Sequence, residues 1–154
     1  MALLTFVYIL LAFYIGSSVQ TEYRKCEGGL PEPSNLKIEG CDKLPCLFVK
    51  GTDLKAQWDF VVTADTATLK PQVKLTVLGI TTDFEYPHPD ACEDLINSEC
   101  PLEKGELVTY ALTMSILKSY PNIRLEVEFS LLDENKNAQV CFIIEGKIKP
   151  NQNY

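Results

Sequence analysis

RLEVEFSLLD, residues 124–133, is the stretch that decides the fold class. Apolar side chains stand at every second position up to Leu131, and charged or polar side chains take the positions between them. A period of two is that of a β-strand with one face in a core and the other in water. The face that we expect to be buried carries Leu125, Val127, Phe129 and Leu131.

Six more stretches are predicted to be strands, some of them alternating and some apolar on both faces. They are NLKIEG (35–40), CLFVKG (46–51), QWDFVVTA (57–64), QVKLTVLGI (72–80), LVTYALTMSIL (107–117) and QVCFIIEGKI (139–148). Turn-forming sequences such as KGTD, SYPN and DENKN separate them, and no long amphipathic helix pattern is present. About seven short strands with regular turns predict an all-β sandwich of the immunoglobulin-like type.

The N-terminus has the pattern of a secretory signal. Residues 2–15 are apolar and uncharged, a run shorter than the roughly 20 residues of a membrane span. The small residues Gly16, Ser17 and Ser18 follow, which is typical of a cleavage site. We therefore expect residues 1–18 to be a signal peptide and residues 19–154 to be one domain, secreted to the extracellular space rather than kept in lysosomes.

The cysteine pattern indicates disulfides. Six cysteines fall in the predicted mature chain, and an even count in a secreted protein is typical of a disulfide framework. Zinc sites and redox couples favour C-x2-C spacings, which are absent, and the single histidine, His88, offers little help to a metal. Six cysteines allow fifteen pairings. Proximity in sequence favours Cys41–Cys46 and Cys92–Cys100, which leaves Cys26–Cys141.

Composition and motifs argue against several functions. The net charge of -7 disfavours binding to a phosphate backbone, so no nucleic-acid partner is expected. His88 lies in the loop YPHPD without a nucleophile motif, and Glu126 and Glu128 lie on the solvent face of their predicted strand. DENKN lacks the glycine and distal glutamate of a calcium loop and is better explained as a hairpin turn. We expect no enzyme, no metal and no cofactor.

Apolar residues close to predicted loops leave two interpretations open. Phe84 and Tyr86 lie beside prolines in TTDFEYPHP, and Ile116, Tyr120 and Pro121 lie around a strand-to-strand turn. Such side chains can simply cap the core. They can also form the rim of an apolar cavity between two sheets, where an apolar ligand would be held by burial of its surface.

Several motifs in order resemble one family. They are CDKLPC followed by VKGTD, GITTDFEYPHPDAC, CPLEKGELVTY, KSYPNIRLEVEFSLLDENKN and VCF, with a cysteine at position 26. The pattern resembles the ML lipid-recognition domain, the family of the Niemann-Pick type C2 sterol carriers and the mite group 2 allergens, and especially its arthropod members. The resemblance covers nearly all of the predicted mature chain and implies the same three disulfides and one lipid bound between the sheets.

The resemblance also implies a set of lipid-binding residues. Four would form the pocket entrance, two align with family aromatics near the pocket, and one fits a deep wall position by strand alternation. In that order they are Phe84, Ile116, Tyr120 and Pro121; Phe129 and Phe142; and Phe60. Phe129 and Phe142 stand where the mammalian sterol carriers have tryptophan, which favours another lipid such as a fatty acid or a semiochemical.

Two lipid-binding functions are compatible with the sequence. The leading one is a secreted, monomeric carrier that binds a sterol, fatty acid or similar lipid and hands it to a membrane or receptor. The alternative is a lipid-recognition co-receptor or innate-immune interaction module for microbial lipids. A wider cavity for several acyl chains would favour the second function.

Overall fold

The structure, a computed structural model, describes residues 19–152 as two stacked β-sheets. The predicted signal peptide, residues 1–18, lies outside the described residues. The smaller sheet has three strands, in the order β1 (Ser34–Ile38), β3 (Asp53–Val61) and β6 (Leu107–Ser115). Both neighbouring pairs in it are antiparallel.

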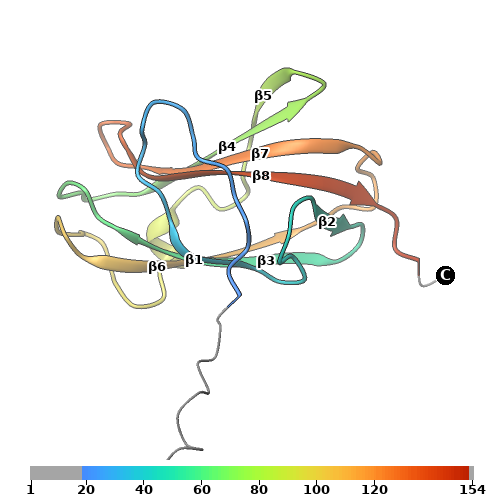
Figure 1. The fold of residues 1–154 in the computed structure, drawn as a ribbon. Coiled ribbons are helices and arrows are strands. Elements are labelled where there is room, and N and C mark those ends of the chain that lie inside the picture. The colour runs from blue at the N-terminus through green and yellow to red at the C-terminus, as the bar shows by residue number, and fades with distance from the viewer. Residues whose placement is uncertain (1–18, 153–154) are drawn as a thin grey trace, which may run out of the picture.

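The larger sheet has five strands and forms the other layer (Figure 1). Their order is β2 (Cys46–Val49), β8 (Ala138–Lys149), β7 (Arg124–Leu132), β4 (Lys70–Val77) and β5 (Ile80–Phe84). All pairs are antiparallel except β2 with β8, which run parallel. The only helical segment among residues 19–152 is the short 3-10 turn η1 (Ala91–Asp94).

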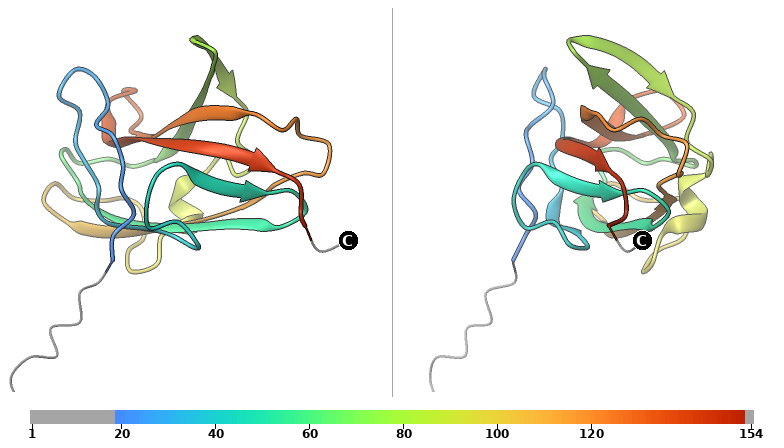
Figure 2. Two further views of the ribbon diagram at one scale, coloured as in Figure 1. Left: turned by 45° about the vertical axis from the view of Figure 1, so that its right-hand side comes forward. Right: turned by 90° about the vertical axis from the view of Figure 1, so that its right-hand side faces the viewer.

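The predicted all-β sandwich is confirmed, but it has eight strands where the sequence indicated about seven. QVKLTVLGI was expected to be one strand, whereas the chain turns back after Val77. Leu78 and Gly79 have φ of 51° and 80°, and Val77 pairs with Ile80 across them. Two positive φ values are what a tight two-residue hairpin requires. The second arm of this hairpin is β5, of which the sequence had assigned only Ile80 to a strand. Figure 2 shows the hairpin projecting above the other strands.

Strand alternation determines the core. Trp58, Phe60 and Val62 are buried, as predicted from QWDFVVTA, and in β7 Leu125, Phe129 and Leu131 are buried. The two sheets meet through these inward faces, as the period of two requires. Within residues 19–152 no helix is long and apolar enough to cross a membrane.

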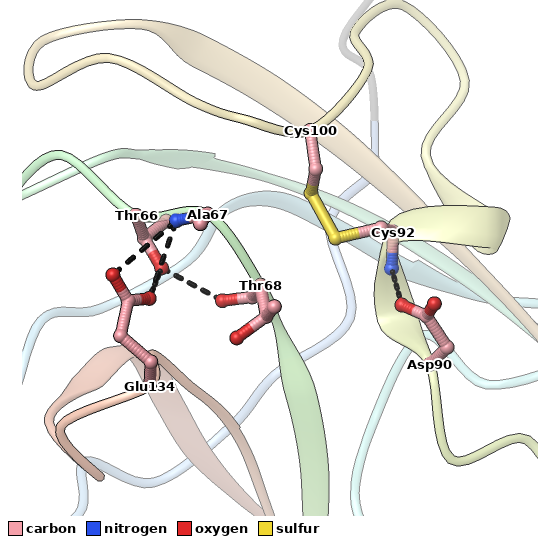
Figure 3. The surroundings of a disulfide bond; sticks show 7 residues. All are labelled: Thr66, Ala67, Thr68, Asp90, Cys92, Cys100 and Glu134. Atoms are coloured by element: carbon pink, nitrogen blue, oxygen red, sulfur yellow. Dashed lines mark hydrogen bonds between the residues drawn. A yellow bond between two sulfur atoms is a disulfide. The ribbon is translucent and has the colours of Figure 1, made fainter.

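Three disulfides tie the sandwich together, and their pairing is the one that proximity favoured. They are Cys26–Cys141, Cys41–Cys46 and Cys92–Cys100. The third joins η1 to the loop before β6 (Figure 3). At the start of η1, the carboxylate of Asp90 accepts a hydrogen bond from the Cys92 N–H at 2.9 Å. DENKN connects β7 to β8 as a turn, since Asp133 Oδ1 accepts hydrogen bonds from the backbone N–H groups of Asn135 and Asn137.

Candidate functional site

A cavity of about 190 Å³ lies between the two sheets. Strands of both sheets line it, together with the segment after β5 and the connection from β6 to β7. The atoms that face the space are apolar. A space lined in this way favours apolar molecules over water, so the cavity can hold hydrocarbon but offers little to a polar group.

The cavity occupies one half of the sandwich. Along β3 the inward residues Leu54, Ala56 and Trp58 line it, and the lining stops there. Along β7 it runs from Leu125 to Phe129 and again stops before the next inward residue. Beyond this line the two sheets pack directly on each other. The packed half contains the buried residues Phe60, Val62, Leu69, Leu102, Val108, Leu131 and Val140.

An aromatic cluster forms the boundary between the two halves. The Trp58 ring lies 5.0 Å from Phe129 and 4.9 Å from Phe142, measured between ring centroids, and both contacts are edge-to-face. Phe129 and Phe142 stack at 5.9 Å, as partners in the β7–β8 register. Edge-to-face pairs contribute about 0.5–1.5 kcal/mol each beyond area burial. The closed end of the cavity is therefore rigid and aromatic.

The opposite end of the cavity opens to solvent. Several of its wall residues there are partly buried, at the ends of β4 and β6 and in the β6–β7 connection, and Pro121 is exposed. The connection supplies Tyr120, Pro121 and Ile123, and β4 supplies Val77, next to the turn of the β4–β5 hairpin. This group of partly exposed apolar side chains marks the mouth of the cavity.

The structure brings together six of the seven residues predicted from the sequence. The six that line the cavity are Phe84, Ile116, Tyr120, Pro121, Phe129 and Phe142. Phe60 does not line it, and the expectation of a deep wall position there is wrong. It faces inward on β3 but lies one inward position past Trp58, in the packed half, where its exposed fraction is 1%. A lipid-contact role for the other six stays a prediction.

Sequence reasoning missed important wall residues. Trp58 and Phe48 of β2 line the cavity, and so does Tyr86, which the sequence suggested only as one of two open interpretations. Trp58 had been assigned to the inward face, but alternation alone does not say where along a strand the packing of two sheets gives way to a space. Phe48 comes from a strand of four residues, too short to show which face would be buried.

A buried polar group lies behind the wall at Tyr86. The hydroxyls of Tyr86 and Tyr110 and a carboxylate oxygen of Asp94 interact electrostatically, yet none makes a hydrogen bond of good geometry. Burial, more than these neighbours, raises the pKa of Tyr110 far above its ordinary value, and burial also raises the pKa of Tyr86. Both phenols therefore stay neutral at physiological pH. Only the ring of Tyr86 is presented to the cavity.

Comparison with known proteins agrees with this architecture. A family model described as ML domain matches residues 20–148. The NPC intracellular cholesterol transporter 2 homolog a of Drosophila melanogaster is 33% identical over 130 residues, which are 83% of this chain and 87% of that protein.

Two solved structures share the fold. A Niemann-Pick type C2 protein from Japanese carpenter ant has a TM-score of 0.76 at 21% identity, covering 83% of this chain and 99% of that one. Chicken MD-1 complexed with lipid IVa has a TM-score of 0.53 at 16% identity, covering 80% and 85%. With the family model matched over most of its length, this chain belongs to the ML-domain family.

Proposed function

We propose that this protein is a secreted carrier that binds one small lipid, such as a sterol or a fatty acid, in the cavity between its sheets. The observation that carries the proposal is the apolar cavity between the sheets, closed at one end by aromatic side chains and open to solvent at the other. Membership in the ML-domain family, with a sterol-transporter homologue among its relatives, supports it.

The geometry indicates how such a ligand would be held. Burial of its apolar surface contributes about 25 cal/mol per Å², and Trp58, Phe129 and Phe142 form the closed end against which a tail would stop. A polar head group would lose its hydrogen bonds to water inside this cavity. The head group would therefore remain at the mouth, where Tyr120 lines the cavity and could offer its phenol as a hydrogen-bond partner.

Cavity size supports a single small ligand. Sites for drug-sized ligands usually measure about 300–1,000 Å³, so a cavity of about 190 Å³ must widen to take even one sterol or long fatty acid and is far from the size needed for several acyl chains. The alternative function, recognition of microbial lipid by an innate-immune module, has support from the fold shared with chicken MD-1 complexed with lipid IVa. The narrow cavity favours the carrier.

Exposed apolar side chains beside the mouth support transfer at a lipid surface. Leu78 and Ile80, at the turn of the β4–β5 hairpin, have exposed fractions of 97% and 70%. Val77 of the same hairpin lines the cavity. Insertion of this tip into a bilayer would place the mouth against the lipid, so that a ligand could leave without crossing water. In this proposal the protein acts by binding and release and catalyses no reaction.

The test is native mass spectrometry of the mature protein secreted from eukaryotic cells, followed by denaturation to identify any lipid carried with it. The expected result is one ligand per chain, with the mass of a sterol, fatty acid or similar amphiphile. A lipid with several acyl chains would favour the immune module. No ligand, together with no uptake from a mixed lipid panel, would exclude the carrier.

A further inference from the structure

A second hollow lies at the opposite edge of the sandwich from the β4–β5 hairpin. It has a volume of about 300 Å³ and lies beside β2, whereas β5 forms the other edge of the same sheet. Its lining is mixed: Leu47 and Val49 supply apolar surface, and Glu39, Asp53 and Lys149 supply charge. This hollow is open to solvent.

Three side chains line both the cavity and the second hollow. They are Phe48, Leu54 and Ile116, so the two spaces are separated only by the thickness of these side chains. Ile116 is held in place by its backbone, since its carbonyl accepts from the Gly51 N–H at 2.6 Å and its N–H donates to the Thr52 carbonyl at 2.9 Å. Phe48 has the largest side chain of the three and belongs to an edge strand of only four residues.

The position of the Phe48 ring depends on a glycine in the neighbouring strand. The ring packs directly on the backbone of Gly146 in β8. A Cβ at that position would lie 2.8 Å and 2.9 Å from the ring carbons Cζ and Cδ2 and would overlap Cε2. Gly146 is not one of the described glycines with a positive φ, so its backbone conformation does not require a glycine. Close approach of a neighbouring group is the usual alternative reason for glycine inside a strand.

We propose that the second hollow is a second portal of the lipid cavity, closed by the ring of Phe48 while it rests on Gly146. When the ring swings away, the bound lipid passes between β2 and β3, against Val49 and Leu54, and exchanges without using the main mouth. This inference rests on the proposed function, because it concerns the path of the same ligand.

Two substitutions open the portal in different ways. Gly146→Ala adds a methyl group where the ring lies and so displaces the ring without shortening it. Phe48→Ala removes the ring. For each variant the test measures two quantities: the equilibrium Kd for a fluorescent fatty acid, cis-parinaric acid, and its dissociation rate into excess unlabelled oleic acid. We expect both variants to release the probe about tenfold faster, the factor that corresponds to 1.4 kcal/mol in the barrier. In Gly146→Ala, which keeps every wall side chain, the change in Kd should be much smaller than tenfold, whereas Phe48→Ala also removes a wall contact and should weaken Kd as well.

A matched control separates the portal from a general loss of stability. Val140→Ala removes buried methyl groups from the packed half and does not touch the cavity. It should destabilise the fold without changing the dissociation rate. Equal acceleration by Val140→Ala would overturn the portal, and so would wild-type rates in both Gly146→Ala and Phe48→Ala. Failure of the wild type to bind any lipid would instead overturn the proposed function, and the portal with it.

Discussion

The indole ring of Trp58 stands edge-on to Phe142, with planes at 77° and ring centroids 4.9 Å apart, at the closed end of the cavity. Trp58 is the only tryptophan in the chain. Its fluorescence therefore reports on one place, the wall that a lipid tail would touch. This makes ligand binding measurable without a label on the protein.

We expect bound cis-parinaric acid to quench the emission of Trp58 by energy transfer and unlabelled lipid to restore it. The measurement is a fluorescence titration at fixed protein concentration. In Trp58→Phe the transfer should disappear while binding, followed by the emission of the probe itself, continues. Binding of lipid with no change in Trp58 emission would place the ligand outside this cavity.

Phe84→Ala should weaken lipid binding. The side chain lines the cavity but is only partly buried, so its removal takes contact from the ligand with little effect on the fold. We expect a loss of about 1–2 kcal/mol in binding free energy, measured as the Kd of a fluorescent lipid. Ile116→Ala should act in the same direction. Unchanged affinity in both variants would remove these residues from the site.

Phe60→Ala is the control for that experiment. Phe60 is fully buried in the packed half, so its truncation should lower the free energy of unfolding by about 3–5 kcal/mol, measured by urea denaturation. Its side chain does not face the cavity, and the Kd of the remaining folded protein should stay that of the wild type.

Strand alternation predicted most of the fold, because side chains on a pleated strand have only two directions. It correctly placed Leu125 and Phe129 inside, and cysteine proximity gave the right disulfides. It failed at Leu78–Gly79, because tight hairpins usually show Asn-Gly or Asp-Gly and a leucine at positive φ leaves no such signal.

The position of the cavity could be predicted only in part, and the family resemblance supplied most of it. Whether an inward side chain meets another side chain or a space depends on the distance between the sheets at that point. Phe60 and Trp58 have the same pattern on the same strand, yet only Trp58 reaches the space. The contact of Phe48 with Gly146 joins two strands nearly a hundred residues apart, and no local pattern reveals it.

Leu78→Asp should slow lipid transfer to membranes. A carboxylate at the tip of the β4–β5 hairpin opposes insertion into a bilayer, while the cavity itself keeps all its wall residues. The measurement is transfer of cis-parinaric acid from the loaded protein to phosphatidylcholine vesicles, with Kd determined separately. Leu107→Asp is a matched control, because Leu107 is also exposed but lies on β6, at the end away from the mouth, and should leave transfer unchanged. Equal transfer rates in Leu78→Asp and Leu107→Asp would contradict docking through the hairpin.

Acid should weaken the link between the β7–β8 turn and the segment before β4. Glu134 accepts a hydrogen bond from the Thr66 hydroxyl at 2.6 Å and one from the Ala67 N–H at 3.2 Å (Figure 3). The Thr66 bond, more than any other neighbour, lowers the pKa of the Glu134 carboxyl below its ordinary value of 4.5. A lowered folded-state pKa means that this stabilisation is present above pH 4.5 and is lost as the pH falls through the lowered value.

Glu134→Gln tests this link. Comparison of the urea midpoints of the wild type and the variant between pH 6 and about pH 3 should show a smaller decline with acid for the variant. The effect should be modest, since Glu134 is exposed and solvent screens its interactions. Parallel curves for the two proteins would show that the turn does not respond to pH through this carboxylate.

The three disulfides should differ in their contribution to stability. Cys26–Cys141 spans 115 residues of sequence and Cys41–Cys46 spans 5. Chain-entropy arguments give about 4–5 kcal/mol for the long loop and about 2 kcal/mol for the short one. Replacing Cys26 and Cys141 with serine should therefore lower the urea midpoint more than replacing Cys41 and Cys46. The reverse order would mean that native-state contacts, not loop length, decide the effect.

The division of the sandwich into a packed half and a half that contains the cavity has a consequence for how such a protein can evolve. Side chains around Phe60 contact neighbours on every side, so nearly every change there costs stability. Side chains that line the cavity, such as Val77 and Met114, lack neighbours on one side, so replacing them costs less stability. Mutations can therefore accumulate in one half and change the shape of the cavity, while the other half keeps the chain folded.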